Sequence, residues 1–401
     1  MRGYSLVARI IGLWVFLIIL VGAGLPVKSA EAGSIEDRVK RLEEKIRELE
    51  ATESNEDDLY DIKSQFGKNL RLFGDINYYT DSRERRNRTF SVGSLGMHST
   101  ASYGDRLSFA FEMIVVAHDH STSVNLERIW VGYTVNDLLT LRAGRFHSAL
   151  GYWNKAYHHG KYFFDTVERP FFLKFEDING IMPIHIVGLE LSGAFDSGAG
   201  TLKYWLQLGN GPTLHKDVHW WMYSNTQTYV LVPNNQTDDN DSKQVTARVA
   251  YEPSFLPGLG LGVFGTNFLI EYTDRSVPVE VIDLHQSIYG ADLQYKRGAL
   301  EILSEYFRFK NGEATANAYY GQLSYNLGKF TPYARYEELD TKANDPYLSL
   351  LSGGNERLQY IGGVRFDIDD LHSSVKAQYR YDDWKGGDIY EVFEIQWAFN
   401  F

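Results

Sequence analysis

Cysteine is missing from all 401 residues of this chain. Its absence excludes a disulfide framework, a cysteine-ligated zinc site and an acylated lipoprotein N-terminus. It suits the cell envelope, where an isolated thiol would be oxidised. An excess of basic residues is missing too, because the formal net charge is −12. A nucleic-acid-binding surface, which needs clustered Lys and Arg, is therefore not expected.

Long apolar runs are absent beyond the N-terminus, where Ile10–Leu25 forms one apolar stretch. Arg2 and Arg9 precede this stretch as a charged segment, and Ala30–Ala32 offers a small-residue cleavage site after it. These features predict a secretory signal peptide over residues 1–32. The alternative is an uncleaved anchor, although the run is shorter than the ~20 residues of a spanning helix. Any membrane-spanning part of the mature chain must then consist of strands.

A short heptad pattern follows in residues 33–50. Its apolar positions are spaced alternately four and three residues apart, and they are Ile35, Val39, Leu42, Ile46 and Leu49. This spacing is typical of a coiled-coil seam and predicts a helix that associates with copies of itself. The alternative is an amphipathic helix lying on its own domain. The polar, acidic residues 51–66 are interpreted as a linker.

From about Gly67 onwards the hydrophobic pattern has a period of two residues. In the segment around Phe109, for example, the apolar residues Leu107, Phe109, Phe111 and Met113 alternate with Arg106, Ser108 and Glu112. Such runs exceed the ~5–6 residues of ordinary strands and match the ~9–11 of a tilted membrane-spanning strand. Aromatic residues flank the runs, and short turns alternate with long loops. The sequence therefore predicts an all-β fold over 67–401: a transmembrane antiparallel β-barrel of about sixteen strands.

The last expected strand carries the most specific signal. Its apolar residues alternate up to the end of the chain and are Phe393, Ile395, Trp397, Phe399 and Phe401. An exposed edge of this kind would promote aggregation in a soluble β-protein. Pairing with the first strand would remove that edge, so we expect the two to close the barrel.

The longest expected loop spans residues 146–183 and contains many aromatic side chains. A loop of this length without regular structure is uncommon and usually functional. Folding into the barrel would bury its aromatic rings and narrow the channel. We therefore interpret it as a constriction loop, with an external lid or a cap at a subunit contact as the alternative.

Charged residues on the expected lumen face decide ion selectivity. Strand parity predicts that both signs point inward: basic Arg71, Arg106, Arg128, Arg142, Lys203, Arg248, Arg335, Arg365, Lys376 and Arg380, and acidic Asp75, Glu112, Glu190, Asp292, Glu301, Glu305, Glu337, Asp367 and Glu394. For most of them, pairing with a cross-strand neighbour is the simpler interpretation. The constriction loop contributes Lys155, Asp165, Glu168, Arg169, Glu176 and Asp177. Our hypothesis is a field across the constriction, with acids opposite arginines, and modest ion selectivity.

Three segments give a resemblance to a known family: residues 128–154, the VERPF segment at 167–171 and the VGLELSG segment at 187–193. Together with the signal peptide and short coiled coil, they resemble bacterial outer-membrane porins of the family that includes the phosphate-selective porins. The resemblance spans most of the mature chain, through loose motifs. It implies sixteen strands, a trimer, passive diffusion of small solutes and a constriction loop at this position. The anion ladder of the phosphate-specific members is not visible.

Catalytic chemistry has little support in the sequence. No GxSxG motif occurs, and most of the histidines cluster in expected loops, without an HExxH spacing. We therefore predict no enzyme activity, no metal site and no cofactor. The expected function is an outer-membrane porin, weakly charge-selective, for small hydrophilic solutes or ions. Its expected partners are outer-membrane lipid and two further copies in a homotrimer. Alternatives are a plugged barrel that tethers the membrane and an anion-selective or phosphate-selective channel.

Overall fold

The computed structural model describes residues 69–82, 88–117, 122–157, 160–175, 180–217, 228–233, 242–274, 280–385, 387 and 389–401. The expected signal peptide, coiled coil and linker lie outside these residues. The described chain forms two sheets: one closed barrel and one separate two-stranded sheet. Among the described residues, no helix is long and apolar enough to cross a membrane.

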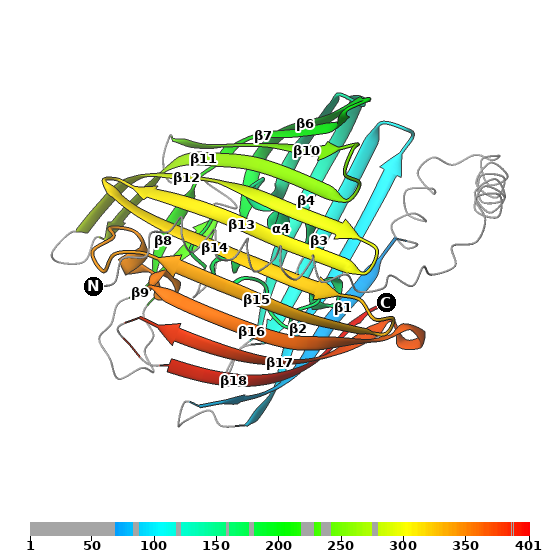
Figure 1. The fold of residues 1–401 in the computed structure, drawn as a ribbon. Helices are drawn as coiled ribbons and strands as arrows, with labels where there is room; N and C mark the ends of the chain where they lie inside the picture. The colour runs from blue at the N-terminus through cyan, green and yellow to red at the C-terminus, as the bar shows by residue number, and fades with distance from the viewer. Residues whose placement is uncertain are drawn as a thin grey trace, which may run out of the picture. The chain divides into compact units, whose positions relative to one another are not determined.

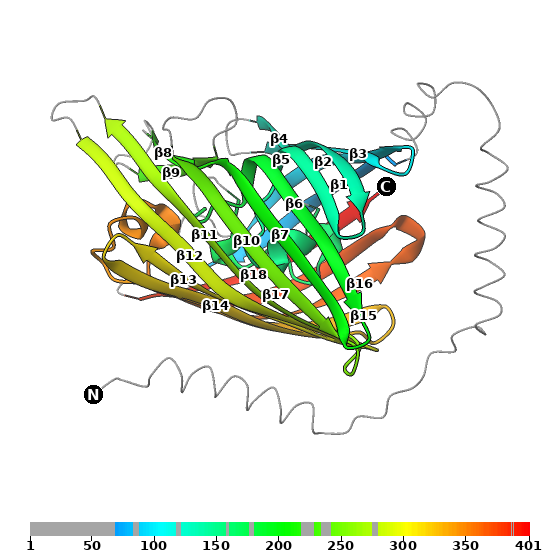
Figure 2. The same ribbon diagram turned by 90° about the horizontal axis from the view of Figure 1, so that it is seen from above.

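Sixteen antiparallel strands close the barrel, as the sequence predicts. The first seven are β1 (Arg71–Asp81), β2 (Thr89–Tyr103), β3 (Leu107–Ala117), β4 (Thr122–Asn136), β5 (Leu139–His147), β6 (His185–Ser197) and β7 (Gly200–Asn210). The others are β10 (Lys243–Pro253), β11 (Leu259–Asp274), β12 (Glu280–Arg297), β13 (Leu300–Asn311), β14 (Ala314–Tyr325), β15 (Phe330–Asp340), β16 (Arg357–Ile368), β17 (Ser373–Trp384) and β18 (Ile389–Asn400). The strands run obliquely to the barrel axis (Figures 1 and 2).

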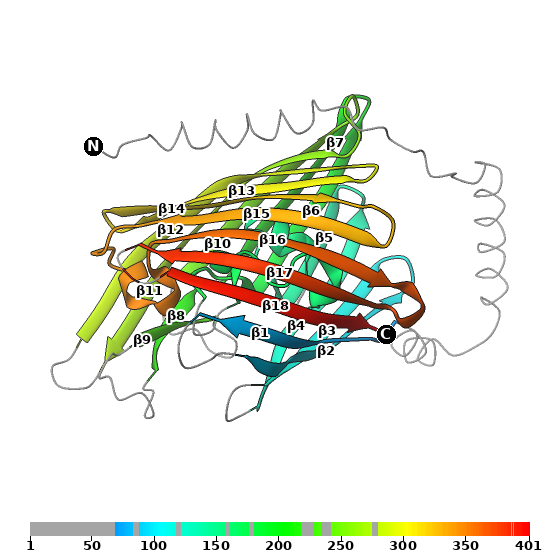
Figure 3. The same ribbon diagram turned by 60° about the horizontal axis from the view of Figure 1, so that its bottom comes forward.

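The first and last strands complete the wall, as expected. Nine residue pairs join β1 to β18, from Phe73 with Asn400 to Asp81 with Val392. Leu72 and Phe401 also exchange two backbone hydrogen bonds of 2.7 and 2.8 Å. Figure 3 shows β18 beside β1. Closure satisfies the backbone groups of both edges, which neither strand could do alone.

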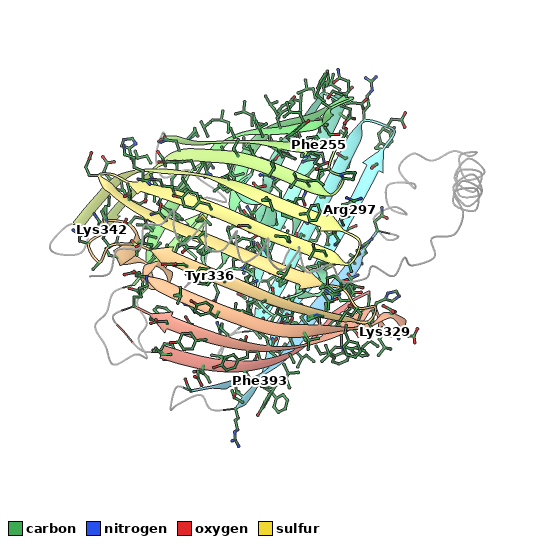
Figure 4. The ribbon with its side chains drawn as sticks, viewed as in Figure 1. Phe255, Arg297, Lys329, Tyr336, Lys342 and Phe393 are labelled. Carbon is green, nitrogen blue, oxygen red and sulfur yellow. The ribbon has the colours of Figure 1, made fainter. Side chains whose placement is uncertain are left out.

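Connections at the two barrel ends differ in length. At one end, here called the turn end, short turns join β2 to β3, β4 to β5 and the later pairs. At the opposite, loop end, β5 and β6 are separated by residues 148–184, and β7 and β10 by a segment that contains the hairpin β8 (Pro212–Asp217) and β9 (Thr228–Pro233). The loop end also has one short connection, between Asn311 at the end of β13 and Ala314 at the start of β14, where the alternation of turns and loops predicts a long one. Phe255, Arg297 and Lys329 lie at the turn end, and Lys342 lies at the other (Figure 4).

Apolar side chains cover the outer face of the wall. They include exposed residues on most strands, such as Leu72, Val131, Leu206, Tyr360 and Phe393. Tyr336 and Phe393 point away from the barrel in Figure 4. The opposite face of the same strands carries charged and amide side chains on β3 to β7, β10 and β15 to β18. The barrel is therefore apolar outside and largely polar inside, the reverse of a water-soluble β-protein.

Candidate functional site: the lumen and its internal loop

The segment between β5 and β6, residues 148–184, is called the internal loop below because it lies inside the barrel. It contains the helix α4 (Gly151–Ala156) and two single turns, η1 (Lys161–Phe163) and η2 (Phe171–Leu173). α4 contacts β11 and β12, while η1 contacts β1 and β18. Its green ribbon is seen behind β13 and β14 in Figure 1. The loop therefore lies against strands of the barrel, and its role as a constriction stays a prediction.

Polar side chains of the wall accept hydrogen bonds from the loop backbone. Glu305 on β13 accepts from the Trp153 amide at 2.7 Å. Glu337 on β15 accepts from the Phe171 amide at 2.5 Å, and Gln378 on β17 from the Val167 amide at 3.1 Å. These acceptors satisfy amides that would otherwise be buried without a partner.

Gly151 allows the close approach of α4 to Glu305. Its φ is +81°, and a Cβ at this position would lie only 1.8 Å from Glu305 Oε2. A side chain there would be strained in its backbone and would collide with the carboxylate. Glycine at position 151, the first residue of α4, is therefore what allows the loop to approach the wall this closely.

Basic side chains of the wall donate hydrogen bonds to the same loop. The fully buried Lys376 donates from Nζ to the carbonyl oxygens of Lys161 at 2.5 Å and Thr166 at 2.8 Å. Arg365 donates from Nη1 to the Tyr162 carbonyl at 2.6 Å. Arg335 donates to Thr166 Oγ1 at 2.8 Å and forms an ion pair with Glu337. Three residues that the sequence suggests for ion selectivity therefore hold the loop, because their charged groups are bound to it.

An apolar core fills the space between the loop and one side of the barrel. The wall contributes buried residues from β11 to β15, namely Phe264, Phe268, Ile270, Leu284, Ile288, Leu303, Phe307, Phe309, Ala316, Ala318, Tyr320 and Leu339. The loop contributes, among others, Leu150, Trp153, Phe172 and Ile181. Leu214 and Leu231 of the β8–β9 hairpin and Leu348 near β15 also join it. The inner face of the wall is therefore apolar on this side of the barrel.

The opposite side of the lumen, on β3 to β7 and β10, carries charged and aromatic residues. Arg128 pairs with Glu112 at 2.5 Å, Arg142 with Glu190 at 2.6 Å and Arg248 with Asp292. Lys155 from α4 also reaches Glu190, at 3.2 Å. The guanidinium of Arg142 lies 4.7 Å from the Trp130 ring centroid, and the Lys155 ammonium lies 5.6 Å from that of Trp205.

Pairing between neighbours determines the electrostatics of the inner wall on both sides of the lumen. Arg128, Arg142, Arg248, Arg335 and Arg365 each have a carboxylate of the wall within 4 Å. Charge of one sign is therefore not collected on one side of the constriction, as the expected transverse field requires. A strongly selective pore carries a ring or ladder of charges of one sign.

The remaining predicted residues occupy different environments. Arg380 pairs with Glu394 at 3.4 Å on the lumen face. Asp165 lies in the internal loop, where burial raises the pKa of its carboxyl group. Arg169 is buried in the loop, with its guanidinium 3.9 Å from the Phe175 ring centroid. Arg71 lines a cavity at the turn end. Glu176 and Asp177 lie outside the described residues.

Arg106 does not belong to the lumen. It lies in the turn between β2 and β3 and is exposed, with Nη1 3.4 Å from the hydroxyl of Tyr133, an exposed residue of the outer face. The strand parity that predicted an inward position does not apply, because the strand begins only at Leu107.

Lys161 and Glu168 form an ion pair within the internal loop at 2.6 Å, and Lys161 also lies 3.6 Å from Asp75 on β1. Burial alone would raise the pKa of Glu168, but Lys161 and Lys174 outweigh it and lower the pKa to about 2. Burial alone would lower the pKa of Lys161, but Glu168 and Asp75 outweigh it and raise the pKa. Both groups therefore stay charged across the physiological pH range.

Glu168→Gln should lower barrel stability in a pH-dependent manner. Because the folded pKa of Glu168 is below its unfolded value of about 4.3, its contribution is complete above pH ~4.3 and is lost as pH falls towards 2. The measurement is the temperature of the heat-induced electrophoretic shift of wild type and variant between pH 7 and pH 3. The difference between the two should be constant down to pH ~4.5 and shrink below it. A difference that is already gone at pH 6 would contradict the assignment.

Two features of the site are missed by the sequence interpretation. One is a buried pair of histidines at the base of the loop, His147 and His185, whose rings are 4.9 Å apart. The ring of Phe175 stacks on His185 at 5.6 Å. In the sequence, the contact between the two histidines could have been indicated only by their places at the end of β5 and the start of β6. The other is the pair of inward tryptophans, Trp130 and Trp205, which occupy polar positions in the alternation.

Within the described part of the chain, no cluster of His, Asp or Glu could hold a metal ion.

The fold is that of known porins. Salmonella typhi OmpF in complex with daunomycin superimposes with a TM-score of 0.54 and 13% identity, over 83% of this chain and 97% of that one. The anion-selective porin from Comamonas acidovorans gives 0.52 and 14%, over 83% and 98%. The channel DcaP of Acinetobacter baumannii gives 0.53 and 10%, over 83% and 96%. At these identities the likeness concerns the fold. No protein-family profile and no curated sequence matches the chain.

Proposed function

We propose that this protein is an outer-membrane porin for small hydrophilic solutes or ions, with weak charge selectivity. The observation that carries the proposal is a closed sixteen-stranded barrel with an apolar outer face, a polar inner wall and a loop folded inside. An apolar face of this extent is stable against lipid hydrocarbon and unstable in water. The porins of similar fold support the same function.

The inner wall of β3 to β7 and β10 supports a solute path. Side chains there keep part of their surface accessible: the exposed fraction is 30% for Arg142 and 36% for Lys203. The internal loop is bound to the other side, against β11 to β18, through its apolar core and its hydrogen bonds. We propose that solutes pass between the loop and this polar wall. In the homotrimer that we also propose, each subunit would contain one such path.

A plugged barrel is the second candidate. The apolar core specifically favours it, because three segments at the loop end are buried together inside the barrel. A barrel closed in this way would tether the outer membrane through the predicted N-terminal helix and would pass no current.

Conductance of the detergent-folded full chain in a planar bilayer distinguishes the two. We expect stable open steps grouped in threes and a small reversal potential in a salt gradient. No current from a barrel that still shows the heat-induced electrophoretic shift would overturn the porin proposal and favour the plugged barrel. A strongly anion-selective reversal potential would contradict the weak selectivity.

Lys203 on β7 and Glu252 on β10 form an ion pair of 2.6 Å, and each charge can be removed in a variant of its own. Both side chains are more than one-third exposed, and the hydrogen bond of Lys203 is to Glu252 rather than to the loop. Lys203→Gln should shift the reversal potential towards cations and Glu252→Gln towards anions. The change in permeability ratio should not exceed about fivefold, because exposed charge pairs contribute about 0–1 kcal/mol. Equal shifts of the same sign would contradict a solute path along this wall.

A further inference from the structure

A small cavity lies inside the barrel at the turn end, between β1, β2 and the internal loop. Its volume is about 200 Å³, and its lining residues are Asn69, Arg71, Phe73, His98, Thr100 and Phe163. At about 30 Å³ for each water molecule, the space corresponds to roughly seven waters. This is enough for a single ring that carries one small polar group.

The floor of the cavity is aromatic and tightly built. The Phe73 ring is buried and meets the Phe163 ring edge-to-face, with centroids 6.2 Å apart. Gly96 provides the necessary space, because a Cβ there would lie 2.0 Å from the Phe73 ring. Phe163 belongs to η1, so the floor forms only when the internal loop lies against β1. A rigid aromatic surface of this kind favours another ring in an edge-to-face or offset arrangement.

The rim of the cavity is polar, and its fixed charge is positive. Arg71 faces His98 directly across β1 and β2. No ion pair joins Arg71 to any residue that the structure describes, and no acidic residue lines the cavity. Glu112, which faces His98 across β2 and β3, is already paired with Arg128. Asp75, further along β1, is bonded to Ser94 and Asn77. The guanidinium of Arg71 is thus the fixed charge available to a ligand.

We infer that this cavity is a binding site for small aromatic monocarboxylates, with the carboxylate on Arg71 and the ring against Phe73 and Phe163. Thr100 and His98 supply further polar groups beside the carboxylate. An arginine can hold both oxygens of a carboxylate through two parallel hydrogen bonds, which inorganic phosphate would also satisfy. The aromatic floor is what separates the two ligands, because phosphate gains nothing from it. This inference deepens the proposed function by naming a solute class for the same lumen.

The test is binding of 4-fluorobenzoate to the detergent-folded full chain, followed by fluorine NMR and competed with benzoate. Wild type should bind saturably, and benzoate should displace the probe while inorganic phosphate at the same concentration should not. Arg71→Gln should weaken binding about tenfold or more, since it removes a charge-assisted hydrogen bond. Phe163→Ala should weaken it too, by removing half of the floor.

Arg106→Gln is the matched control for Arg71, because it removes an exposed arginine at the same barrel end outside the cavity. Phe255→Ala is the control for Phe163, since Phe255 is 82% exposed in the turn before β11. Both controls should bind as wild type does. Unchanged binding by Arg71→Gln, or displacement by phosphate as effective as by benzoate, would overturn the inference. Binding is read without a membrane, so a barrel that binds the probe but conducts no current would overturn the porin proposal alone.

Discussion

Replacing Lys376 with methionine is expected to release the internal loop while leaving the barrel wall intact. Methionine keeps an unbranched apolar stem but removes the ammonium that donates to the carbonyls of Lys161 and Thr166. A buried acceptor on Thr166 and a partly buried one on Lys161 then lose their partner, at a cost of about 1–3 kcal/mol each. A total of at least ~2 kcal/mol corresponds to a shift of roughly thirtyfold in the docking equilibrium of the loop.

The wall should survive this change because the strand ladder does not depend on it. Twelve residue pairs join β16 to β17, and eleven join β17 to β18. The heat-induced electrophoretic shift should therefore persist. Protease cleavage within residues 148–184 should become faster, and the single-channel steps should become larger and noisier.

Lys329→Met is the matched control. Lys329 is exposed in the turn between β14 and β15, at the turn end of the barrel (Figure 4). The same substitution there should change neither cleavage nor conductance. If Lys376→Met behaves like this control, the lysine does not hold the loop, and a role in ion selectivity again becomes the better explanation.

Much of the barrel could be predicted from sequence because the patterns that define its strands lie within short segments of the chain. Alternation at a period of two assigns each residue to a face, and the apolar face of β18 requires a partner strand. The position of the internal loop could be predicted from its length and its aromatic rings. These inferences need only neighbours within one strand or one connection.

The interior core could not be predicted in this way. In β11, Leu261 and Val263 are exposed on the outer face, whereas Phe264 and Phe268 are buried on the inner face. Both faces are apolar, so the alternation that marks a lipid-facing strand disappears there. Alternation over residues 259–270 is therefore weak, because this strand is apolar on both of its faces.

The loop anchors were missed for a different reason. Lys376 and Lys161 are 215 residues apart in sequence, and no local pattern connects them. Strand parity correctly predicts that Lys376 points inward but cannot tell what it meets there. A charge facing a lumen can belong to the solute path or to the loop, and only the packed structure decides between them.

The core predicts a second large effect, from Trp153→Ala. Trp153 is fully buried, and its ring centroid lies 4.5 Å from that of Tyr157, 5.4 Å from Phe164 and 5.8 Å from Tyr320. Truncation of a buried tryptophan costs about 3–5 kcal/mol through lost burial and the cavity that remains. The loss falls on the contact between α4 and the wall, so the loop should again become accessible to protease. Trp205→Ala, on the half-buried inner face of β7, should have a much smaller effect on cleavage.

Combining the two substitutions tests whether the loop docks as one unit. Lys376 and Trp153 act at different places, on the η1 side and on α4, yet both stabilise the same docked state. Once either change has undocked the loop, the other has little left to remove. The cleavage rate of the double variant should therefore be close to that of the more severe single variant. Fully additive effects would instead mean that the two ends of the loop open independently, as sites without shared partners do. The lumen would then be narrowed by two separate segments rather than by one internal loop.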